Sequence, residues 1–216
     1  ITGLQGSGRD ELADALFGVI PCKGKLSFGG QTLESAKSIQ FHMGHGMALV
    51  PRMRKERGIH DDLSILDNMS MAFLNTKWKK LLISGKAERE RFARQQKALQ
   101  IKAGNPADPI TSLSGGNQQK VILGRWLLLN PDVLLLDDPT RGIDVGAKYE
   151  IYQLIFDLAK QNKGVIICSS EMPELLGICD RVLVLSSGHL TGEYDLVHDR
   201  EHATQENIMV DATKFV

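Results

Sequence analysis

The chain has 216 residues, and its 26 lysine and arginine residues balance 26 aspartate and glutamate residues, so its formal net charge is zero. That length suffices for an α/β domain with a buried core, which excludes a fibre or a peptide scaffold. The charge balance gives no sign of a polyanion-binding or basic membrane-surface protein. The three cysteines lack a disulfide-scaffold spacing, which indicates a reducing compartment. No apolar run approaches the roughly 18–20 residues of a membrane-spanning helix.

The first predicted elements are a glycine-rich loop from Gly3 to Gly8 and a helix. The apolar residues of the helix recur at helical spacing up to Gly18, which ends it. Alternating apolar residues in 25–28 and 31–33, on either side of Gly29-Gly30, predict a tight β-hairpin and a small antiparallel sheet. The sequence begins at Ile1, directly before the glycine cluster, and we expect the natural protein to continue upstream.

The middle of the chain, from about Ile59 to Pro109, is polar and rich in helix-favouring residues, which predicts a helical insert. After it, short apolar runs at 133–136, 165–168 and 182–185 predict strands of a mainly parallel sheet. An apolar stripe from Ala147 to Leu158 predicts a helix packed on that sheet.

We therefore expect an α/β fold in which residues 1–216 form one domain, itself a fragment of a longer chain. Its predicted parts are a core with a small β-subdomain at 1–58 and 111–194, a helical subdomain at 59–110 and a polar C-terminal tail at 195–216.

Two segments carry the most specific pattern in the chain. The first is Leu113-Ser-Gly-Gly-Asn-Gln-Gln-Lys120, and the second, about one helix later, is Val133-Leu-Leu-Leu-Asp-Asp-Pro-Thr-Arg-Gly-Ile-Asp144. The pair resembles the signature motif, Walker B strand and D-loop of ABC-transporter ATPases. The Asn-Gln-Gln-Lys and Thr-Arg-Gly-Ile-Asp variants resemble the ribose, galactose and xylose importer branch, in which two ATPase halves are commonly fused. This resemblance, which covers essentially the whole chain, implies a P-loop NTPase core and a C-terminal ATPase half.

The Ser-Gly-Gly segment has a physical reason to contact phosphate. It precedes an apolar helix, so free backbone N–H groups and the positive helix end can face an anion. The resemblance implies that Ser114, Gly115, Gly116 and Gln118 complete the ATP site of an opposite half. A capped helix start is the alternative interpretation of Ser-Gly-Gly taken alone.

Two aspartates end the predicted strand at 133–136. A carboxylate there can hold Mg²⁺ beside the β- and γ-phosphates, and this is the expected role of Asp137. Asp138 stands where the family usually has the glutamate that orients or deprotonates the attacking water, and aspartate is one methylene shorter. Misplacement by about 1 Å can cost on the order of a hundredfold in rate. Asp144 resembles the D-loop aspartate that bridges the two halves.

The glycine loop departs most from the expected pattern, G-x-x-x-x-G-K-[ST]. Gly3 and Gly8 have the right spacing, but Arg9 replaces the lysine and Asp10 replaces the hydroxyl residue. Arginine is bulkier and forked, and an aspartate beside a triphosphate repels it unless Mg²⁺ intervenes. The resemblance to the sugar-importer branch, whose second half commonly has Gly-Arg-Thr here, makes Arg9 a usual residue and Asp10 the larger departure. The expected nucleotide-binding residues of this loop are Gly3, Gly6, Ser7, Gly8, Arg9 and Asp10. A Rossmann loop is the competing interpretation, although residues 6–11 lack its final glycine or alanine.

Two further positions differ from the family. Arg52 stands where a glutamine or glutamate of the Q-loop relays nucleotide state to the membrane subunit, and Ser170 stands at the switch histidine. We expect Asp138 and Ser170 to be the catalytic positions. Because Arg9, Asp10, Arg52, Asp138 and Ser170 all weaken one site, we expect it to be degenerate. Independent drift around a working site is the alternative.

Other patterns are weaker. The segment His198-Asp-Arg-Glu-His202 matches the H-x-x-E-H motif of some zinc peptidases, but its polar surroundings favour a solvated tail. His42 and His45 could share a metal, yet no third ligand is near. The run Lys77-Trp-Lys-Lys80 and the arginines at 89–94 could indicate a nucleic-acid face, but intervening glutamates favour a helical insert that docks a membrane partner.

The resemblance implies an ATPase component of a carbohydrate importer, with ATP and Mg²⁺ as cofactors, on the cytosolic face of the inner membrane. Its expected partners are a second ATPase half upstream or a homodimer, a permease and, indirectly, a periplasmic sugar-binding protein, but not nucleic acid. The alternatives are a non-hydrolysing regulatory half and a soluble ABC ATPase acting on DNA or ribosomes.

Overall fold

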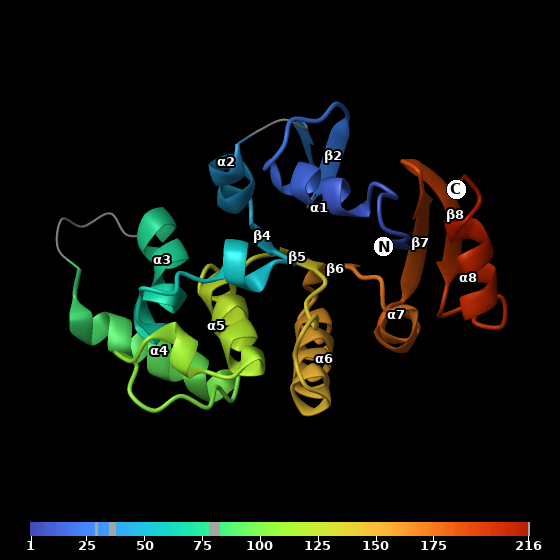
Figure 1. The fold of residues 1–216 in the computed structure, drawn as a ribbon. Helices are drawn as coiled ribbons and strands as arrows, with labels where there is room; N and C mark the ends of the chain where they lie inside the picture. The colour runs from blue at the N-terminus through green and yellow to red at the C-terminus, as the bar shows by residue number, and fades with distance from the viewer. Residues whose placement is uncertain (29, 35–37, 78–82, 216) are drawn as a thin grey trace. The chain divides into compact units, whose positions relative to one another are not determined.

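A short strand and a glycine loop start the chain in the computed structural model, which describes residues 1–28, 30–34, 38–77 and 83–215 (Figure 1). The chain forms two compact units. The first contains Ile1–His42, Leu135–Asp138 and Ile166–Val216, and the second contains Met43–Leu134 and Pro139–Val165.

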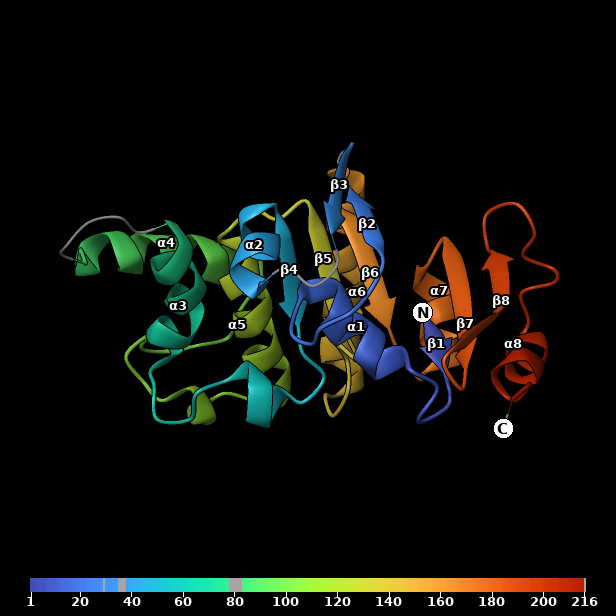
Figure 2. The same cartoon turned by 90° about the horizontal axis from the view of Figure 1, so that it is seen from above.

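The first unit is built around a three-stranded sheet in the order β1-β7-β8, formed by Thr2–Gly3, Arg181–Ser186 and His189–Asp195. β1 runs parallel to β7, so that Gly3 lies opposite Leu185. β8 is antiparallel to β7, with an irregularity in register between Val184 and Leu185. Helix α8 (Gln205–Ala212) packs beside β7 and β8 (Figure 2). Both β8 and α8 lie where the sequence analysis predicted no regular element.

Helix α1 (Arg9–Phe17) follows the glycine loop, as predicted. Gly8 precedes the helix with a φ of 92°, and Gly18 ends it with a φ of 78°, a left-handed conformation that glycine adopts at little cost. The predicted hairpin is also confirmed: β2 (Lys25–Phe28) pairs antiparallel with β3 (Gln31–Glu34). Gly30 has a φ of 74° in its turn, and Gly29 lies outside the described residues. Helix α7 (Met172–Ile178) follows strand β6, and α2 (Ile39–Gly44) lies at the boundary with the second unit.

The second unit is mainly helical, as the polar stretch at 59–109 predicts. Helices α3 (Ile65–Lys77) and α5 (Gly115–Leu127) pack together, and α4 (Gly85–Ala98) packs on α3 (Figure 1). A buried strand, β4 (Met47–Val50), precedes a π-helical turn, η1 (Arg54–Gly58), and a short 3₁₀ turn, η2 (Ile110–Ser112), precedes α5. The sequence analysis did not predict β4.

The predicted apolar strands and the amphipathic helix are confirmed. The strand order is β4-β5-β6, where β5 is Val133–Asp137 and β6 is Gly164–Cys168. Four of the five β5 residues are buried. Helix α6 (Val145–Lys160) buries one face through Ala147, Ile151, Ile155 and Leu158. Within the described part of the chain, no helix is both long and apolar enough to cross a membrane.

Candidate functional site

The glycine loop between β1 and α1 is a tight turn that requires glycine for steric reasons. A Cβ atom on Gly3 would lie 2.4 Å from Ser7 Oγ and 2.5 Å from the carbonyl oxygen of Leu185. The Ser7 N–H donates to Leu4 O at 3.0 Å, and Ser7 O accepts from the Gly188 N–H at 2.8 Å. Gly6 adopts a φ of 80°. The loop therefore has one compact shape, fixed from both sides by backbone hydrogen bonds.

Arg9, directly after this loop, is buried and binds two carboxylates at once. Its Nη2 lies 3.2 Å from Asp138 Oδ2 and 3.1 Å from Asp10 Oδ1, and its Nε lies 3.3 Å from the same Asp10 oxygen. The side chains of Arg9 and Asp138 are each 7% exposed, whereas that of Asp10 is 29% exposed. Three positions that depart from the family pattern thus form a single ionic cluster.

Asp138 is also held by its backbone and by the turn after β6. Its φ is 44°, in the left-handed region that aspartate tolerates better than most residues. Its N–H donates to Cys168 O at 2.7 Å, and its Oδ1 accepts from the Ser170 N–H at 3.2 Å. Both carboxylate oxygens of Asp138 therefore accept hydrogen bonds from the protein. Ser170 contributes its backbone here, and the residue itself is exposed.

The donors around the loop fit an anion better than they fit a metal ion. Ser7 Oγ and Arg9 Nη1 are buried and have no hydrogen-bond partner within the described residues. Buried polar atoms are nearly always satisfied, so these two donors match an anionic ligand such as phosphate. The carboxylates of Asp10 and Asp138 already have Arg9 as their counter-ion. Asp137, which is 4% exposed, is the carboxylate next to this cluster that could serve as an oxygen ligand for Mg²⁺.

The Ser-Gly-Gly loop lies in the second unit, at the start of α5. Ser114 is the N-cap residue, is exposed, and accepts a hydrogen bond on its Oγ from Asn117 Nδ2 at 2.9 Å. A Cβ atom on Gly116 would lie 2.4 Å from the Cβ of Ala147, so glycine is needed for the start of α5 to pack on α6. The close packing leaves the free N–H end of α5 beside the exposed serine.

Gln118 points into the unit instead of toward the exposed end of the helix. Its Nε2 donates to the carbonyl oxygens of Ile110 and Leu113 at 3.3 and 3.2 Å, and its Oε1 accepts from Arg54 Nε at 3.2 Å. Only 7% of the residue is exposed. A contact between Gln118 and nucleotide stays a prediction, and the observed bonds give this side chain a role in shaping the loop.

Asp144 caps helix α6 next to the Ser114 loop. Its Oδ1 accepts from the Ala147 N–H at 2.9 Å. A cavity of about 220 Å³ lies here, lined by Ser114, Gly116 and Asp144 together with Lys102 and Glu150. The second unit thus brings together the predicted residues Ser114, Gly116 and Asp144, with Gly115 between the first two.

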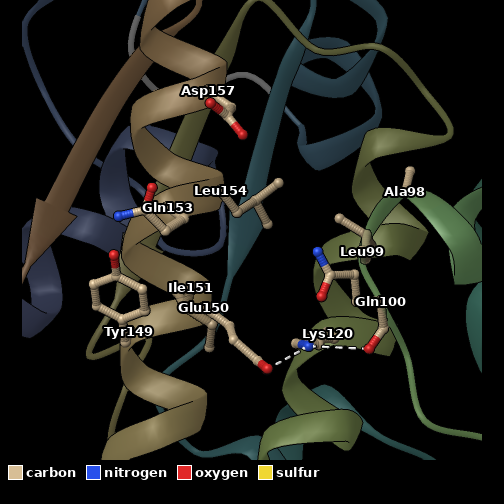
Figure 3. Close-up of a pocket in the computed structure, with 10 residues that line it drawn as sticks. All are labelled: Ala98, Leu99, Gln100, Lys120, Tyr149, Glu150, Ile151, Gln153, Leu154 and Asp157. Atoms are coloured by element: carbon tan, nitrogen blue, oxygen red, sulfur yellow. Dashed lines mark hydrogen bonds and ion pairs between the residues drawn. The ribbon is translucent and has the colours of Figure 1, made fainter.

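A second cavity, of about 240 Å³, lies between α5, α6 and the end of α4 (Figure 3). Lys120 is one of the residues that line it, and its Nζ lies 2.6 Å from Glu150 Oε2 and 3.1 Å from Gln100 O. Glu150 lines both cavities. Sequence reasoning did not select Lys120, although a lysine on the apolar helix after Ser-Gly-Gly is a signal for a buried ion pair.

The weaker patterns have local structural explanations. His198 Nδ1 lies 2.9 Å from Asp195 Oδ2, and His202 pairs in the same way with Asp199, so each histidine bonds to the aspartate three residues earlier. In the ranges that the structure describes, no cluster of three or more histidine, cysteine, aspartate or glutamate residues is arranged to hold a metal. Of the basic run at 77–80, residues 78–80 lie outside the described residues.

A glycine loop that enters a helix, a buried strand ending in adjacent aspartates and a Ser-Gly-Gly helix start together define a nucleotide-binding cassette. The fold agrees: a dimeric ATP-binding cassette, solved in a post-hydrolysis state with ADP and phosphate, superposes with a TM-score of 0.75 at 20% identity, over 90% of this chain and 83% of that one. A family model described as ABC transporter matches residues 1–141. The chain belongs to the ABC transporter family.

Relatives in this family are longer than the chain. It is 43% identical over 220 residues to the galactose/methyl galactoside import ATP-binding protein MglA of Haemophilus influenzae, covering 100% of this chain and 42% of that protein. It is 44% identical over 220 residues to the xylose import ATP-binding protein XylG of Geobacillus kaustophilus, covering 99% of this chain and 42% of that protein. The chain therefore spans about two fifths of the length of the relatives it matches.

Proposed function

We propose that the chain is the C-terminal ATP-binding half of an importer for a carbohydrate, and that its two nucleotide-related regions do different work. The Ser114 loop completes the ATP site of a second half, and we call this shared site the composite site. The site at the chain's own glycine loop hydrolyses ATP slowly or not at all. The names of the relatives support the importer assignment and a carbohydrate substrate. The partners would be a second ATPase half, upstream in the same polypeptide or as a homodimer, a permease and a periplasmic sugar-binding protein, with the chain on the cytosolic side.

The observation that carries the asymmetry is the hydrogen bonding of Asp138. A general base must reach the attacking water with a free lone pair, within about 2.6–3.2 Å. Here one oxygen of Asp138 accepts from Arg9 and the other accepts from the Ser170 N–H. Each oxygen keeps a further lone pair, but the two contacts fix the orientation of the carboxylate and hold it against Arg9, so we expect water activation at this loop to be slow.

The Ser114 loop has the features expected of a loop that completes the ATP site of a second half. The first N–H groups of α5 have no partner within the helix, and the helix dipole favours a negative charge at that end. In a composite site these donors would stabilise the charge that spreads over the transferred phosphoryl group during in-line attack by water. When bound there, Mg²⁺ would supply neutralisation of the phosphate oxygens. Asp144, beside the loop, is the predicted contact to the second half.

The test of the degenerate site uses the chain itself. Arg9→Lys, Asp10→Thr and Asp138→Glu are combined to install the family's residues, and Glu11→Gln, an exposed acid on the same helix, is the matched control. Phosphate release is measured with saturating ATP and Mg²⁺. We expect the native chain and the Glu11→Gln variant to turn over far below about 1 s⁻¹, the low end of typical enzyme turnover, and the triple variant to turn over faster than both. Turnover near that rate by the native chain would contradict the proposal.

The test of the composite site uses the full-length protein assembled with its permease. Ser114→Ala is compared with Thr111→Ala, an exposed change three residues earlier. We expect Ser114→Ala to lower ATP hydrolysis and transport at least tenfold and Thr111→Ala to leave both unchanged. Transport that is unaffected by Ser114→Ala would instead favour the second candidate, a half that only positions its partner, which the Arg9–Asp138 contact also supports.

A further inference from the structure

The π-helical turn η1 is held at both ends by one face of helix α5. At its start, Arg54 Nε donates to Gln118 Oε1 at 3.2 Å. At its end, the carbonyl oxygen of Gly58 accepts from Arg125 Nη1 at 2.7 Å. Gln118 and Arg125 are seven residues apart, which is about two helical turns and the same face. The two ends of a five-residue turn are therefore fixed to one rigid helix.

Between these hydrogen bonds the turn packs directly on the helix. A Cβ atom on Gly58 would lie 2.8 Å from Ile122 Cδ1, so the glycine allows a closer approach than any other residue would. Ile122 is fully buried and lies on α5 between Gln118 and Arg125. The contact leaves η1 little freedom to slide along α5.

Arg125 is buried, and all of its hydrogen bonds among the described residues go to neutral oxygens. Besides Gly58 O, it donates to Asn68 O at 2.6 Å and to Asn68 Oδ1 at 3.2 Å. Burial lowers the pKa of Arg125 to about 10. A buried charge is costly to desolvate, and these three bonds fix the guanidinium in one position between η1 and α3. Through Asn68, Arg125 also ties the start of α3 to η1 and α5.

The same contacts reach the Ser114 loop. Gln118 donates to Ile110 O and Leu113 O, and Leu113 directly precedes Ser114. Arg54 Nη2 lies 3.0 Å from the position of a Cβ atom on Gly115. A displacement of η1 would therefore act on the residues on both sides of Ser114.

We propose that Arg54 is a positioning residue for the Ser114–Gly116 loop, and that η1, clamped on α5 by Arg54 and Arg125, sets the loop's geometry. The structural part of this proposal stands on the contacts of the chain. Only its consequence for ATP hydrolysis rests on the proposed function.

The structural test measures amide hydrogen exchange in the chain at the Leu113 and Gln118 N–H groups, which bond to Ile110 O and Ser114 O. Arg54→Met is compared with Lys55→Met, which removes an exposed charge from the same turn, and with Arg54→Lys, which keeps one donor. We expect exchange at both amides to rise at least tenfold in Arg54→Met, to stay unchanged in Lys55→Met and to recover in part in Arg54→Lys. Unchanged exchange in Arg54→Met, or an equal rise in Lys55→Met, overturns the proposal.

A double variant and an activity measurement complete the test. Gln118→Leu removes the bond to Arg54 together with those to Ile110 O and Leu113 O, so adding Arg54→Met to it is expected to raise exchange little beyond Gln118→Leu alone. A further rise equal to that of Arg54→Met alone would overturn the clamp. In the assembled full-length protein, we expect Arg54→Met to lower kcat and kcat/KM for ATP hydrolysis together by about tenfold, with KM unchanged. Faster exchange together with unchanged hydrolysis supports the clamp and counts against the composite site in the proposed function.

Discussion

Arg9 and Asp138 are 129 residues apart in sequence, yet Arg9 Nη2 lies 3.2 Å from Asp138 Oδ2 and both side chains are buried. The relationship links substitutions that look independent in the sequence. The forked guanidinium reaches Asp10 as well as Asp138, which the single ammonium of a lysine would do less well. The departures at positions 9, 10 and 138 are thus compatible with one another, and each is understood best as part of the same cluster.

Removing Arg9 should destabilise the protein far more than an ordinary surface change. Arg9→Met would leave the buried carboxylate of Asp138 without its counter-ion, which costs about 3–5 kcal/mol when a buried pair is broken from one side. Asp138→Asn should cost less, because asparagine tolerates the left-handed backbone and can still accept from the Ser170 N–H. Urea unfolding of both variants gives the two free energies.

The double variant provides the control for that comparison. If the pair is coupled, Arg9→Met combined with Asp138→Asn should be more stable than the sum of the two single changes implies, by about 1–3 kcal/mol. Strict additivity would mean that the observed contact contributes nothing to stability. Glu11→Gln, an exposed acid on the same helix, should change the free energy of unfolding by less than about 0.5 kcal/mol.

The two glycines after Ser114 should respond differently to alanine. Gly116→Ala places a methyl group 2.4 Å from the Ala147 Cβ, so α5 and α6 must move apart, and we expect a loss of about 1–3 kcal/mol. Gly115→Ala first meets the end of the Arg54 side chain at 3.0 Å, which can shift, so the loss should be smaller. Thermal unfolding distinguishes them, and equal losses would contradict the packing argument.

Gly177 is a useful control for these substitutions. It lies within α7, and a Cβ atom there would meet nothing within 4 Å. Gly177→Ala should therefore stabilise the protein by about 0.5–1 kcal/mol, because alanine loses less backbone entropy than glycine on entering a helix. A destabilising result at Gly177 would show that helix propensity does not decide the outcome in this fold.

Elements with strong apolar periodicity were predictable from the sequence. The run at 133–136 and the stripe from Ala147 to Leu158 became β5 and α6, because burial on a sheet or helix face leaves a clear pattern. Strand β8 was not predictable in the same way. It is half exposed, contains Gly192 and depends on pairing with β7 across a register irregularity. Helix α8 buries Ile208 and Ala212 but exposes the apolar residues Met209 and Val210, so its sequence has no clear apolar stripe.

The candidate site was predictable as a set of residues but not as a set of contacts. The motifs identified the glycine loop, the adjacent aspartates and the Ser-Gly-Gly turn, because the residues of each motif lie close together in the sequence. The Arg9–Asp138 bond and the Gln118–Arg54 bond join distant segments, so they follow only from the tertiary structure. The assignment of residues 59–110 to a helical subdomain, and the roles given to each site residue, stay predictions.

Asp144 should have a measurable structural role in addition to any contact with a second half. Asp144→Ala removes the hydrogen bond to the Ala147 N–H at the start of α6, which we expect to cost about 0.5–2 kcal/mol. Asp144→Asn keeps an acceptor at the same place and should cost little. Urea unfolding of the chain measures the cap. Loss of ATP hydrolysis by Asp144→Asn in the assembled protein, with stability preserved, would then report the contact to the other half.

The thiols of Cys168 and Cys179 should make the stability of the protein depend on pH in the alkaline range. Burial raises the pKa of Cys168 and of Cys179 from 9.0 to about 11. The unfolded chain therefore releases these protons first as pH rises, so the stabilising contribution is complete below about pH 9 and is lost as pH rises toward 11. We expect each thiol to account for a loss on the order of 2 kcal/mol across that window.

Urea unfolding at pH 8, 9, 10 and 11 measures this effect, and comparison with cysteine variants separates it from other titrating groups. The variant with Cys168→Ala and Cys179→Ala should lose less stability than the native chain between pH 9 and 11, even though it begins less stable because one buried and one half-buried side chain are smaller. Cys22→Ala is the matched control and should keep the native pH dependence. An identical pH dependence in the double variant would show that burial of these two thiols does not govern the alkaline transition.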